Sequence, residues 1–168
     1  MVKIQDLRHI HMLEQMPAHL LALIGQEAQL SIFSSGTCLF KAGEKVDTFY
    51  MVIMGQVALT VALNPDIDVV LENIQSGRTF GSSALISGGP ATYTAICQEP
   101  CETITLSGSR MQKLFETNDE LAFYLMAGVA RQYKNSMDTR AKMILKTLAR
   151  HPEMKASIHD IDKLTPAY

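Results

Sequence analysis

The sequence predicts an α+β protein that is mainly β: a small antiparallel β-roll or jelly roll with an N-terminal helix and a long C-terminal helix. From residue 33 to residue 107, short apolar runs are separated at regular intervals by glycine and proline turns, as in antiparallel strands. After Leu106 the apolar spacing changes from two to about 3.6, which is the helical period. A chain of 168 residues is expected to form one domain of ordinary size.

The composition narrows the class of protein. Hydrophobic residues make up 47% of the chain and charged residues 19%, which is typical of an ordered globular protein. A formal net charge of -2 argues against a surface built throughout for nucleic acid. The N-terminal stretch lacks the apolar core of a signal peptide, and the apolar run at 49–63 is too short to span a bilayer. These features predict a soluble, cytoplasmic protein.

The N-terminal helix is predicted over residues 16–29, "MPAHLLALIGQEAQ". Pro17 suits the first helical position, and Leu20, Leu21 and Ile24 share one face. We interpret residues 1–16 as an N-terminal extension that precedes the β-roll domain.

The strands are predicted inside a β-roll domain that covers residues 17–118. Gly36, Gly43 and Gly55 interrupt the first apolar runs, and "NPD" at 64–66 forms a turn. Three later segments alternate or are rich in β-branched residues, and we expect them to be further strands: 69–74, 92–97 and 102–107.

The long C-terminal helix is predicted over residues 119–150 and ends before the His151–Pro152 break. At about 1.5 Å per residue it is about 45 Å long, more than the width of a small β-domain. Its apolar residues keep a spacing close to that of a heptad seam: Met126, Ala130, Tyr133, Met137, Ile144 and Leu148. This seam predicts a coiled coil between two copies, and hence a homodimer. The alternative is that the stripe packs on the β-domain of its own chain.

The second half of this helix is basic. Residues 131–150 contain six Lys or Arg side chains and one Asp, a net charge of +5. Either this is a solvated face whose cations also suit a helix C-terminus, or it binds an acidic partner or nucleic acid. Residues 151–168 are assigned to a tail, which is too short to form a helix-turn-helix domain.

Three cysteines cannot form an even disulfide framework. Cys97 and Cys101, in "CQEPC", are interpreted as small apolar residues on neighbouring strands, because a metal site would need two further ligands nearby. The "HIH" at 9–11 would bind a metal only on a strand, since helical spacing points the two rings apart. No metal site is predicted.

Residues 80–95, "FGSSALISGGPATYTA", are the candidate functional stretch. The pattern predicts a strand, a glycine turn, one short helical turn, a glycine–proline turn and another strand. A helix start just after a glycine suits an anion such as phosphate. However, the stretch contains no Arg, Lys, Asp or Glu. The sequence therefore predicts a backbone turn that is suited to bind a phosphate but has no charged side chains.

A longer pattern, G-x6-GExxDxFYxVxxGxVxL, runs from Gly36 to Leu59 and resembles the first half of a cyclic-nucleotide-binding domain. Residues 80–95 fall where that family keeps its phosphate-binding cassette, and residues 101–150 are similar to the strand and helices that follow. The resemblance covers roughly residues 17–150. It implies a β-roll of about eight strands flanked by helices, as in the Crp/Fnr regulators and the regulatory subunit of protein kinase A.

The family cassette typically reads F-G-E-L-A-L-x-x-x-x-P-R-A-A-T. In that family the turn offers backbone N–H groups to the cyclic phosphate, the Glu accepts the ribose 2′-hydroxyl, and the Arg donates to the phosphate. This chain keeps Gly81, Ala84, Leu85, Pro90 and Thr94. Ser82 stands at the Glu position and Ala91 at the Arg position. The resemblance therefore implies that both polar anchors are absent.

The candidate effector contacts are Gly81, Ser82, Ser83, Ala91, Thr92 and, from the long helix, Tyr133. Together these features predict a non-enzymatic sensor module with lost or altered cAMP or cGMP binding. It would take a cyclic nucleotide or another small effector and relay its presence through a dimerisation helix. One alternative is a ligand-independent dimerisation scaffold, and another is a Crp/Fnr-type transcription regulator that lacks its DNA-binding domain. We identify no nucleophile–base pair that would indicate an enzyme. Apart from a cyclic nucleotide or another small effector we expect no cofactor, we expect no membrane partner, and without a helix-turn-helix domain we do not expect a nucleic-acid partner.

Overall fold

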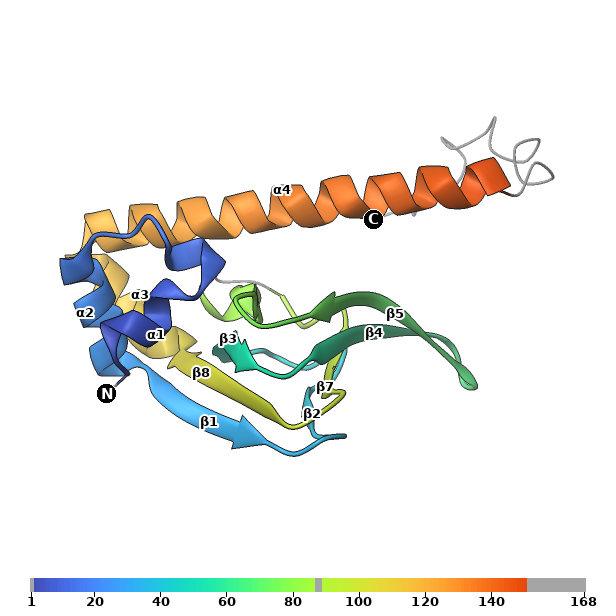
Figure 1. Cartoon of the computed structure of the whole chain (residues 1–168), viewed down its shortest axis with the longest axis horizontal. Coiled ribbons are helices and arrows are strands. Elements are labelled where there is room, and N and C mark those ends of the chain that lie inside the picture. The colour runs from blue at the N-terminus through green and yellow to red at the C-terminus, as the bar shows by residue number, and fades with distance from the viewer. Residues whose placement is uncertain (1, 87–88, 151–168) are drawn as a thin grey trace. The chain divides into compact units, whose positions relative to one another are not determined.

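The computed structural model describes residues 2–86 and 89–150, and the tail predicted at 151–168 lies outside the described residues. The chain divides into two compact units, Met1–Val129 and Ala130–Tyr168. All strands that the structure describes belong to the first unit (Figure 1).

The eight strands of the first unit form two four-stranded antiparallel sheets. One sheet has the order β1-β8-β3-β6 and the other the order β2-β7-β4-β5. The bounds are β1 Gln29–Phe33, β2 Cys38–Phe40, β3 Thr48–Met54, β4 Val57–Asn64, β5 Ile67–Ile74, β6 Thr79–Phe80, β7 Thr94–Cys97 and β8 Cys101–Ser107. The predicted antiparallel β-roll of about eight strands is thus confirmed.

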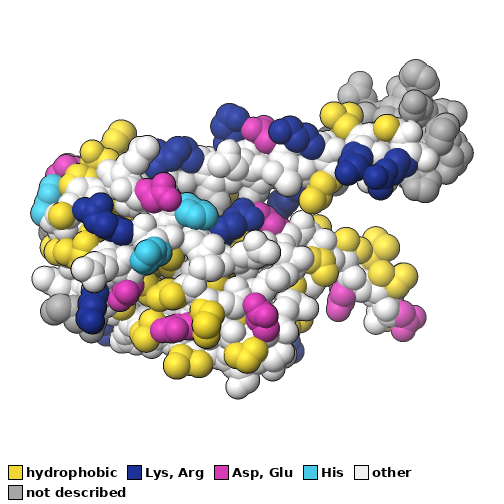
Figure 2. All heavy atoms as spheres, viewed as in Figure 1, with side chains coloured by type: hydrophobic (Ala, Val, Ile, Leu, Met, Phe, Trp, Pro, Cys, Tyr) yellow, Lys and Arg dark blue, Asp and Glu magenta, His cyan; other side chains and the backbone are white. Residues whose placement is uncertain are grey.

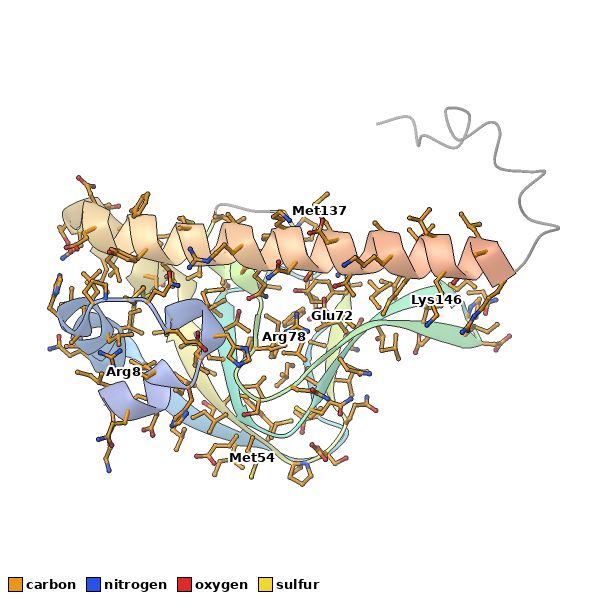
Figure 3. All side chains as sticks on the ribbon, turned by 45° about the horizontal axis from the view of Figure 1, so that its top comes forward. Arg8, Met54, Glu72, Arg78, Met137 and Lys146 are labelled. Carbon is orange, nitrogen blue, oxygen red and sulfur yellow. The ribbon has the colours of Figure 1, made fainter. Side chains whose placement is uncertain are left out.

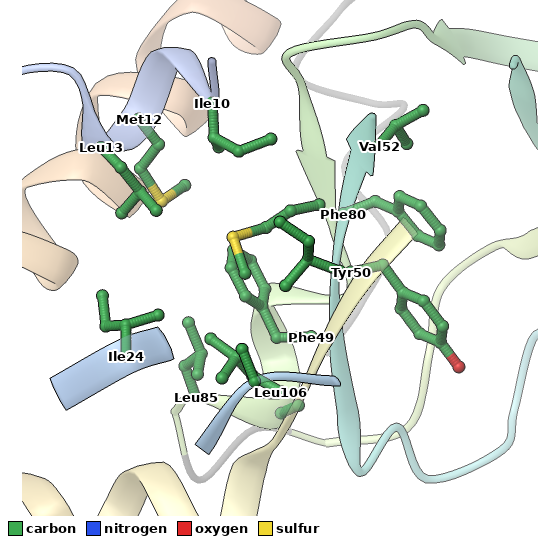
Figure 4. Close-up of a cluster of buried hydrophobic side chains, with 14 of the residues drawn as sticks. Ile10, Met12, Leu13, Ile24, Phe49, Tyr50, Val52, Phe80, Leu85 and Leu106 are labelled. Atoms are coloured by element: carbon green, nitrogen blue, oxygen red, sulfur yellow. The ribbon is translucent and has the colours of Figure 1, made fainter. Parts of the chain in front are cut away.

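The structure describes four α-helices and two 3-10 turns, of which α1, α2 and α3 lie at one end of the two sheets (Figure 1). Their bounds are α1 Ile4–Arg8, η1 His11–Leu13, α2 Ala18–Glu27, η2 Ser82–Ala84, α3 Gly108–Thr117 and α4 Asp119–Arg150. One cluster of buried side chains joins these helices to the strands, and it includes Ile24 of α2, Phe49 of β3 and Leu106 of β8 (Figure 4). The core therefore lies partly inside the roll and partly under the helices.

The N-terminal segment contributes to the core. Leu7, Ile10 and Leu13 are completely buried, and the His11 amide donates to the Gly77 carbonyl at 2.9 Å. Residues 2–16, interpreted from the sequence as an extension, thus pack as part of the first unit.

Helix α2 is shorter than predicted, because the chain becomes extended at Ala28 and β1 begins at Gln29. Five consecutive residues from Gln29 to Phe33 pair with β8, from Thr105 back to Cys101. Long-range pairing with β8 therefore overrides the helical tendency of the "EAQ" sequence.

Helix α4 spans 32 residues. Its first turns carry fully buried Leu121 and Leu125, which belong to the core of the first unit. Its second half, in the other unit, is mostly exposed and lined by Lys and Arg side chains (Figure 2). Among residues 2–86 and 89–150, no helix combines the length and the apolar character needed to cross a membrane.

Candidate functional site

The candidate site is residues 80–95, which we call the cassette. It begins where β6 pairs with β3, with Phe80 opposite Tyr50. The next residue, Gly81, has a φ of +75°, in the left-handed region that favours glycine. A Cβ at this position would lie 2.7 Å from the Thr48 carbonyl oxygen. Both the backbone angle and the space therefore require glycine at this turn.

The short helical turn predicted after Gly81 is a single 3-10 turn, η2. The Ala84 amide donates to the Gly81 carbonyl at 3.0 Å, and the Leu85 amide donates to the Ser82 carbonyl at 3.0 Å. Ser82 is buried and Ser83 is partly buried. These residues form the first arm of the cassette.

The second arm of the cassette is fixed by main-chain bonds to the loop between β2 and β3. The Ala91 amide donates to the Glu44 carbonyl at 2.8 Å, and the Gly43 amide donates to the Ala91 carbonyl at 2.7 Å. The Glu44 carboxylate in turn accepts from the Lys41 amide at 2.8 Å. Ala91 is buried while Thr92 is exposed. The backbone around Ala91 is thus held whatever side chain the position carries.

Two cations, one just before the cassette and one next to the Gly43–Glu44 loop that bonds Ala91, form ion pairs with carboxylates. Arg78, two residues before Phe80, forms an ion pair with Glu72 of β5, at 2.5 Å between Nη2 and Oε1 (Figure 3). Lys45 lies 3.1 Å from Asp47. The cassette itself contains no Lys, Arg, Asp or Glu.

Aromatic rings line the interior of the roll beside the cassette. Phe80 stacks on Tyr50 with ring centroids 4.7 Å apart and planes 3° apart. Phe40 contacts both Phe80 and Tyr93, at 6.1 and 5.7 Å between centroids. Burial raises the pKa of Tyr50, and a hydrogen bond with Thr48 partly opposes this shift.

Reasoning from the sequence missed Tyr93 as a member of the site. The signal was present, because the family pattern R-A-A-T has Ala where this chain has Tyr93. The ring is partly buried and packs against the core cluster. A position-by-position reading of every departure from the pattern, polar or apolar, would have found it.

The predicted contacts from the long helix belong to a different unit from the cassette. Tyr133 is 49% exposed, and its role in the site stays a prediction. Of the predicted seam, Met126 packs partly against the core of the first unit, while Met137 and Ile144 are more than half exposed. The coiled-coil interface also stays a prediction.

In the part of the chain that the structure describes, the cysteines do not form a group that could bind a metal ion. Cys97 at the end of β7 and Cys101 at the start of β8 are free and buried, whereas Cys38 is free and exposed. Burial and a hydrogen bond with Cys101 raise the pKa of Cys97 to about 12. No group of three or more His, Cys, Asp or Glu within residues 2–86 and 89–150 is arranged to hold a metal ion.

Known proteins resemble this chain in sequence over the β-roll. The family model described as "Cyclic nucleotide-binding domain" matches residues 31–118, more than half of the chain. The cAMP-activated global transcriptional regulator CRP of Pasteurella multocida is 30% identical over 105 residues, which are 62% of this chain and 50% of that protein. The cGMP-dependent protein kinase, isozyme 1, of Drosophila melanogaster is 29% identical over 111 residues, 64% of this chain and 14% of the kinase. The chain thus spans half, or less, of the length of these relatives.

A solved structure shares the architecture at low sequence identity. The crystal structure of a cyclic nucleotide-binding domain from Methylobacillus flagellatus has a TM-score of 0.75 and 13% identity, and the likeness covers 86% of this chain and 81% of that one. At this identity the comparison shows a common fold.

Proposed function

Because the chain belongs to the cyclic nucleotide-binding domain family, we propose that it is a non-enzymatic regulatory module whose cassette takes a small effector but binds cAMP and cGMP weakly or not at all. The observation that carries this proposal is a cassette whose described main chain is held by hydrogen bonds at residues 81–85 and 91 and whose sequence has no charged side chain. Gly81 supports the turn and Ala91 is tied to the Gly43–Glu44 loop, while the side chains at the two anchor positions are a hydroxyl and a methyl.

The absence of the two polar anchors determines how much affinity for cyclic nucleotides we expect to be lost. A hydrogen bond to a charged group contributes about 1.5–3 kcal/mol, so two such bonds amount to about 3–6 kcal/mol. Since each 1.4 kcal/mol is tenfold in affinity, the loss is on the order of a thousandfold. Arg78 is not proposed as a replacement, because its guanidinium pairs with Glu72. Effector contacts in this proposal come from the hydroxyl groups of Ser82, Ser83 and Thr92, which can donate or accept weak hydrogen bonds.

In this proposal the second half of α4 relays the state of the site. The seam that includes Tyr133, Met137 and Ile144 forms a homodimer, and effector contact with Tyr133 favours one arrangement of the paired helices. Such coupling requires that the effector bind one arrangement more tightly than the other. The exposure of Met137 and Ile144, at 68% and 60%, supports a role for these side chains in association.

The test begins with the unaltered chain. Thermal unfolding is measured with cAMP and cGMP, because a ligand at 100 times its Kd stabilises a protein by about 2.7 kcal/mol. That is a rise of roughly 5–10 °C for a protein of this size. We expect no such rise at about 100 μM nucleotide, which is 100 times a Kd of 1 μM. Micromolar affinity of the unaltered chain for cAMP would contradict the proposal.

The second arm of the test restores the anchors. The Ser82→Glu/Ala91→Arg variant is expected to bind cAMP more tightly than the unaltered chain in calorimetry, because the backbone cradle is already in place. Ser83→Glu/Ala91→Arg is the matched control, with the same charges and the carboxylate one residue away. A folded Ser82→Glu/Ala91→Arg variant with no gain over this control would contradict an intact cradle.

A ligand-independent dimerisation scaffold is the second candidate, and the exposed seam on α4 is the observation that favours it. Sedimentation separates the two. A sensor changes its dimerisation constant when its effector binds, whereas a scaffold keeps the same constant with every small molecule tested.

A further inference from the structure

We propose that Tyr93 is a third determinant of ligand selectivity: its ring occupies the interior of the roll beside the cassette and excludes the sugar-phosphate ring of a cyclic nucleotide. The inference rests on the proposed function, since it assumes that the cassette is the ligand site. It adds a steric cause of weak cyclic-nucleotide binding to the loss of the two polar anchors.

The position of Tyr93 is fixed by its neighbours in the chain. Ala91, two residues earlier, is held by hydrogen bonds with Gly43 and Glu44, and Thr94, the next residue, begins β7. The hydroxyl of Thr94 accepts from the Ala42 amide at 3.1 Å. The backbone of Tyr93 therefore lies between two anchored points. Two Cα–Cα steps of about 3.8 Å keep its Cα within about 7.6 Å of the Cα at the predicted phosphate-binding position 91.

The ring of Tyr93 points toward the interior of the roll. Phe40 of β2 pairs with Ala95 of β7, and Ala95 is completely buried. Tyr93 lies in a bend directly before β7, and its side chain packs against the buried core cluster that contains Ala95. The centroid distance of 5.7 Å between Tyr93 and Phe40, with planes tilted by 48°, places the ring against Phe40.

Together three rings connect the two arms of the cassette. Phe80 stands directly before Gly81 in the first arm, Tyr93 stands in the second arm, and Phe40 contacts both. The Phe40–Phe80 and Phe40–Tyr93 pairs are in direct contact, at separations that leave no room for a ligand ring between the members of either pair. We call these three residues the aromatic floor. A ribose phosphate that binds against the interior side of the cassette has to displace part of the aromatic floor.

Tyr93 is the member of the aromatic floor that is able to move. Phe40 and Phe80 are 7% and 2% exposed, whereas Tyr93 is only partly buried. A cyclic nucleotide would bind to a minor state in which the Tyr93 ring has left Phe40, so its apparent affinity is reduced by the population of that state. Removing the ring removes this requirement.

The experiment compares variants in the background with restored anchors. Calorimetry with cAMP and cGMP is carried out on Ser82→Glu/Ala91→Arg and on the same protein with Tyr93→Ala added. We expect the triple variant to bind cAMP at least tenfold more tightly. Tyr93→Val, which suits the start of a strand, is made in parallel in case Tyr93→Ala does not fold, and urea unfolding checks each protein.

Two controls separate the ring from other effects. Tyr93→Phe keeps the ring and removes the hydroxyl, so in the same background it should leave the affinity unchanged. Phe33→Ala removes a ring of the same aromatic cluster from β1, 6.4 Å from Tyr50 and outside the aromatic floor. It should also leave the affinity unchanged. Equal gains in cAMP affinity from Phe33→Ala and Tyr93→Ala would overturn the proposal, because the removal of any ring of the cluster would then improve binding.

A second measurement keeps the Tyr93 side chain intact. In the Ser82→Glu/Ala91→Arg variant saturated with cAMP, the nuclear Overhauser contact between the Tyr93 and Phe40 rings should disappear. Its persistence in the bound state would overturn the inference. Equal cAMP affinities of Ser82→Glu/Ala91→Arg with and without Tyr93→Ala would also overturn the inference. If both variants bind cAMP tightly, the proposed function still holds and only the role of Tyr93 is refuted. Tight binding of cAMP by the unaltered chain would instead contradict the proposed function.

Discussion

Replacing Gly81 with alanine is expected to destabilise the protein by about 2–5 kcal/mol, which is large for the addition of one methyl group. Gly81 has a φ of +75°, and an alanine in the left-handed region costs about 1–2 kcal/mol. The new Cβ would also lie 2.7 Å from the Thr48 carbonyl oxygen and 3.2 Å from Cδ2 of Tyr50. Overpacking of this kind adds about 1–3 kcal/mol, because the Thr48 oxygen belongs to the backbone of β3 and cannot rotate away.

Gly36→Ala provides a matched control for backbone strain. Gly36 has a φ of +79°, yet a Cβ there would meet nothing within 4 Å. Its expected cost is the strain alone, about 1–2 kcal/mol. The two variants should therefore differ by about 2 kcal/mol, or roughly 4–8 °C in Tm for a protein of this size.

The assay is thermal and urea unfolding of the unaltered chain, Gly81→Ala and Gly36→Ala under identical conditions. Both variants should unfold in one cooperative step, so that the midpoints report free energies. If the two variants lose the same stability, the close approach of β3 to the cassette turn has no energetic consequence. This result would refute the conclusion that both the positive φ of Gly81 and the close Thr48 carbonyl oxygen require glycine at this position.

Two further predictions concern packing and pH. Gly128→Ala should destabilise the chain by about 1–2 kcal/mol in spite of its better helix propensity, because the new Cβ would meet the buried Met12 side chain. Combining it with Met12→Ala should recover at least about 1 kcal/mol relative to the sum of the single effects, and strict additivity would contradict the contact. The pKa of Cys97, raised to about 12, means that the folded state keeps a proton which the unfolded state releases above about pH 9. Stability should therefore fall as the pH rises from 9 toward 12, with a smaller pH slope in urea unfolding for Cys97→Ala, and an equal slope would contradict the assignment.

The β-roll could be predicted because its signals are local. Glycines with positive φ stand at Gly36, Gly43, Gly55 and Gly81, where the sequence pattern placed turns. Apolar runs between such turns have few alternatives to antiparallel strands. The position of the cassette was predicted for the same reason, since its glycine turn and its length agree with the family pattern.

Features that depend on long-range packing were missed. Residues 28 and 29 were included in the predicted helix, although the chain is extended at Ala28 and Gln29 pairs with β8. Leu7 and Ile10 carry no turn or cap signal that reveals their complete burial against the rest of the first unit. Tyr93 was missed for a related reason: the loss of charged side chains at 82 and 91 is visible in the sequence, whereas the contact of the larger side chain at 93 with Phe40 depends on the fold.

Shape and selectivity are carried by different atoms in this cassette. Its shape depends on the main chain, through the left-handed turn at Gly81 and the paired amides and carbonyls of Ala91, Gly43 and Glu44. None of these bonds involves the side chain at position 91, so an exchange of Arg for Ala there leaves the backbone bonds in place. The same fold can therefore hold a cyclic phosphate in one relative and refuse it in another. The family match at residues 31–118 accordingly predicts the path of the chain, and in the proposed function the side chains at 82, 91 and 93 decide what that path binds.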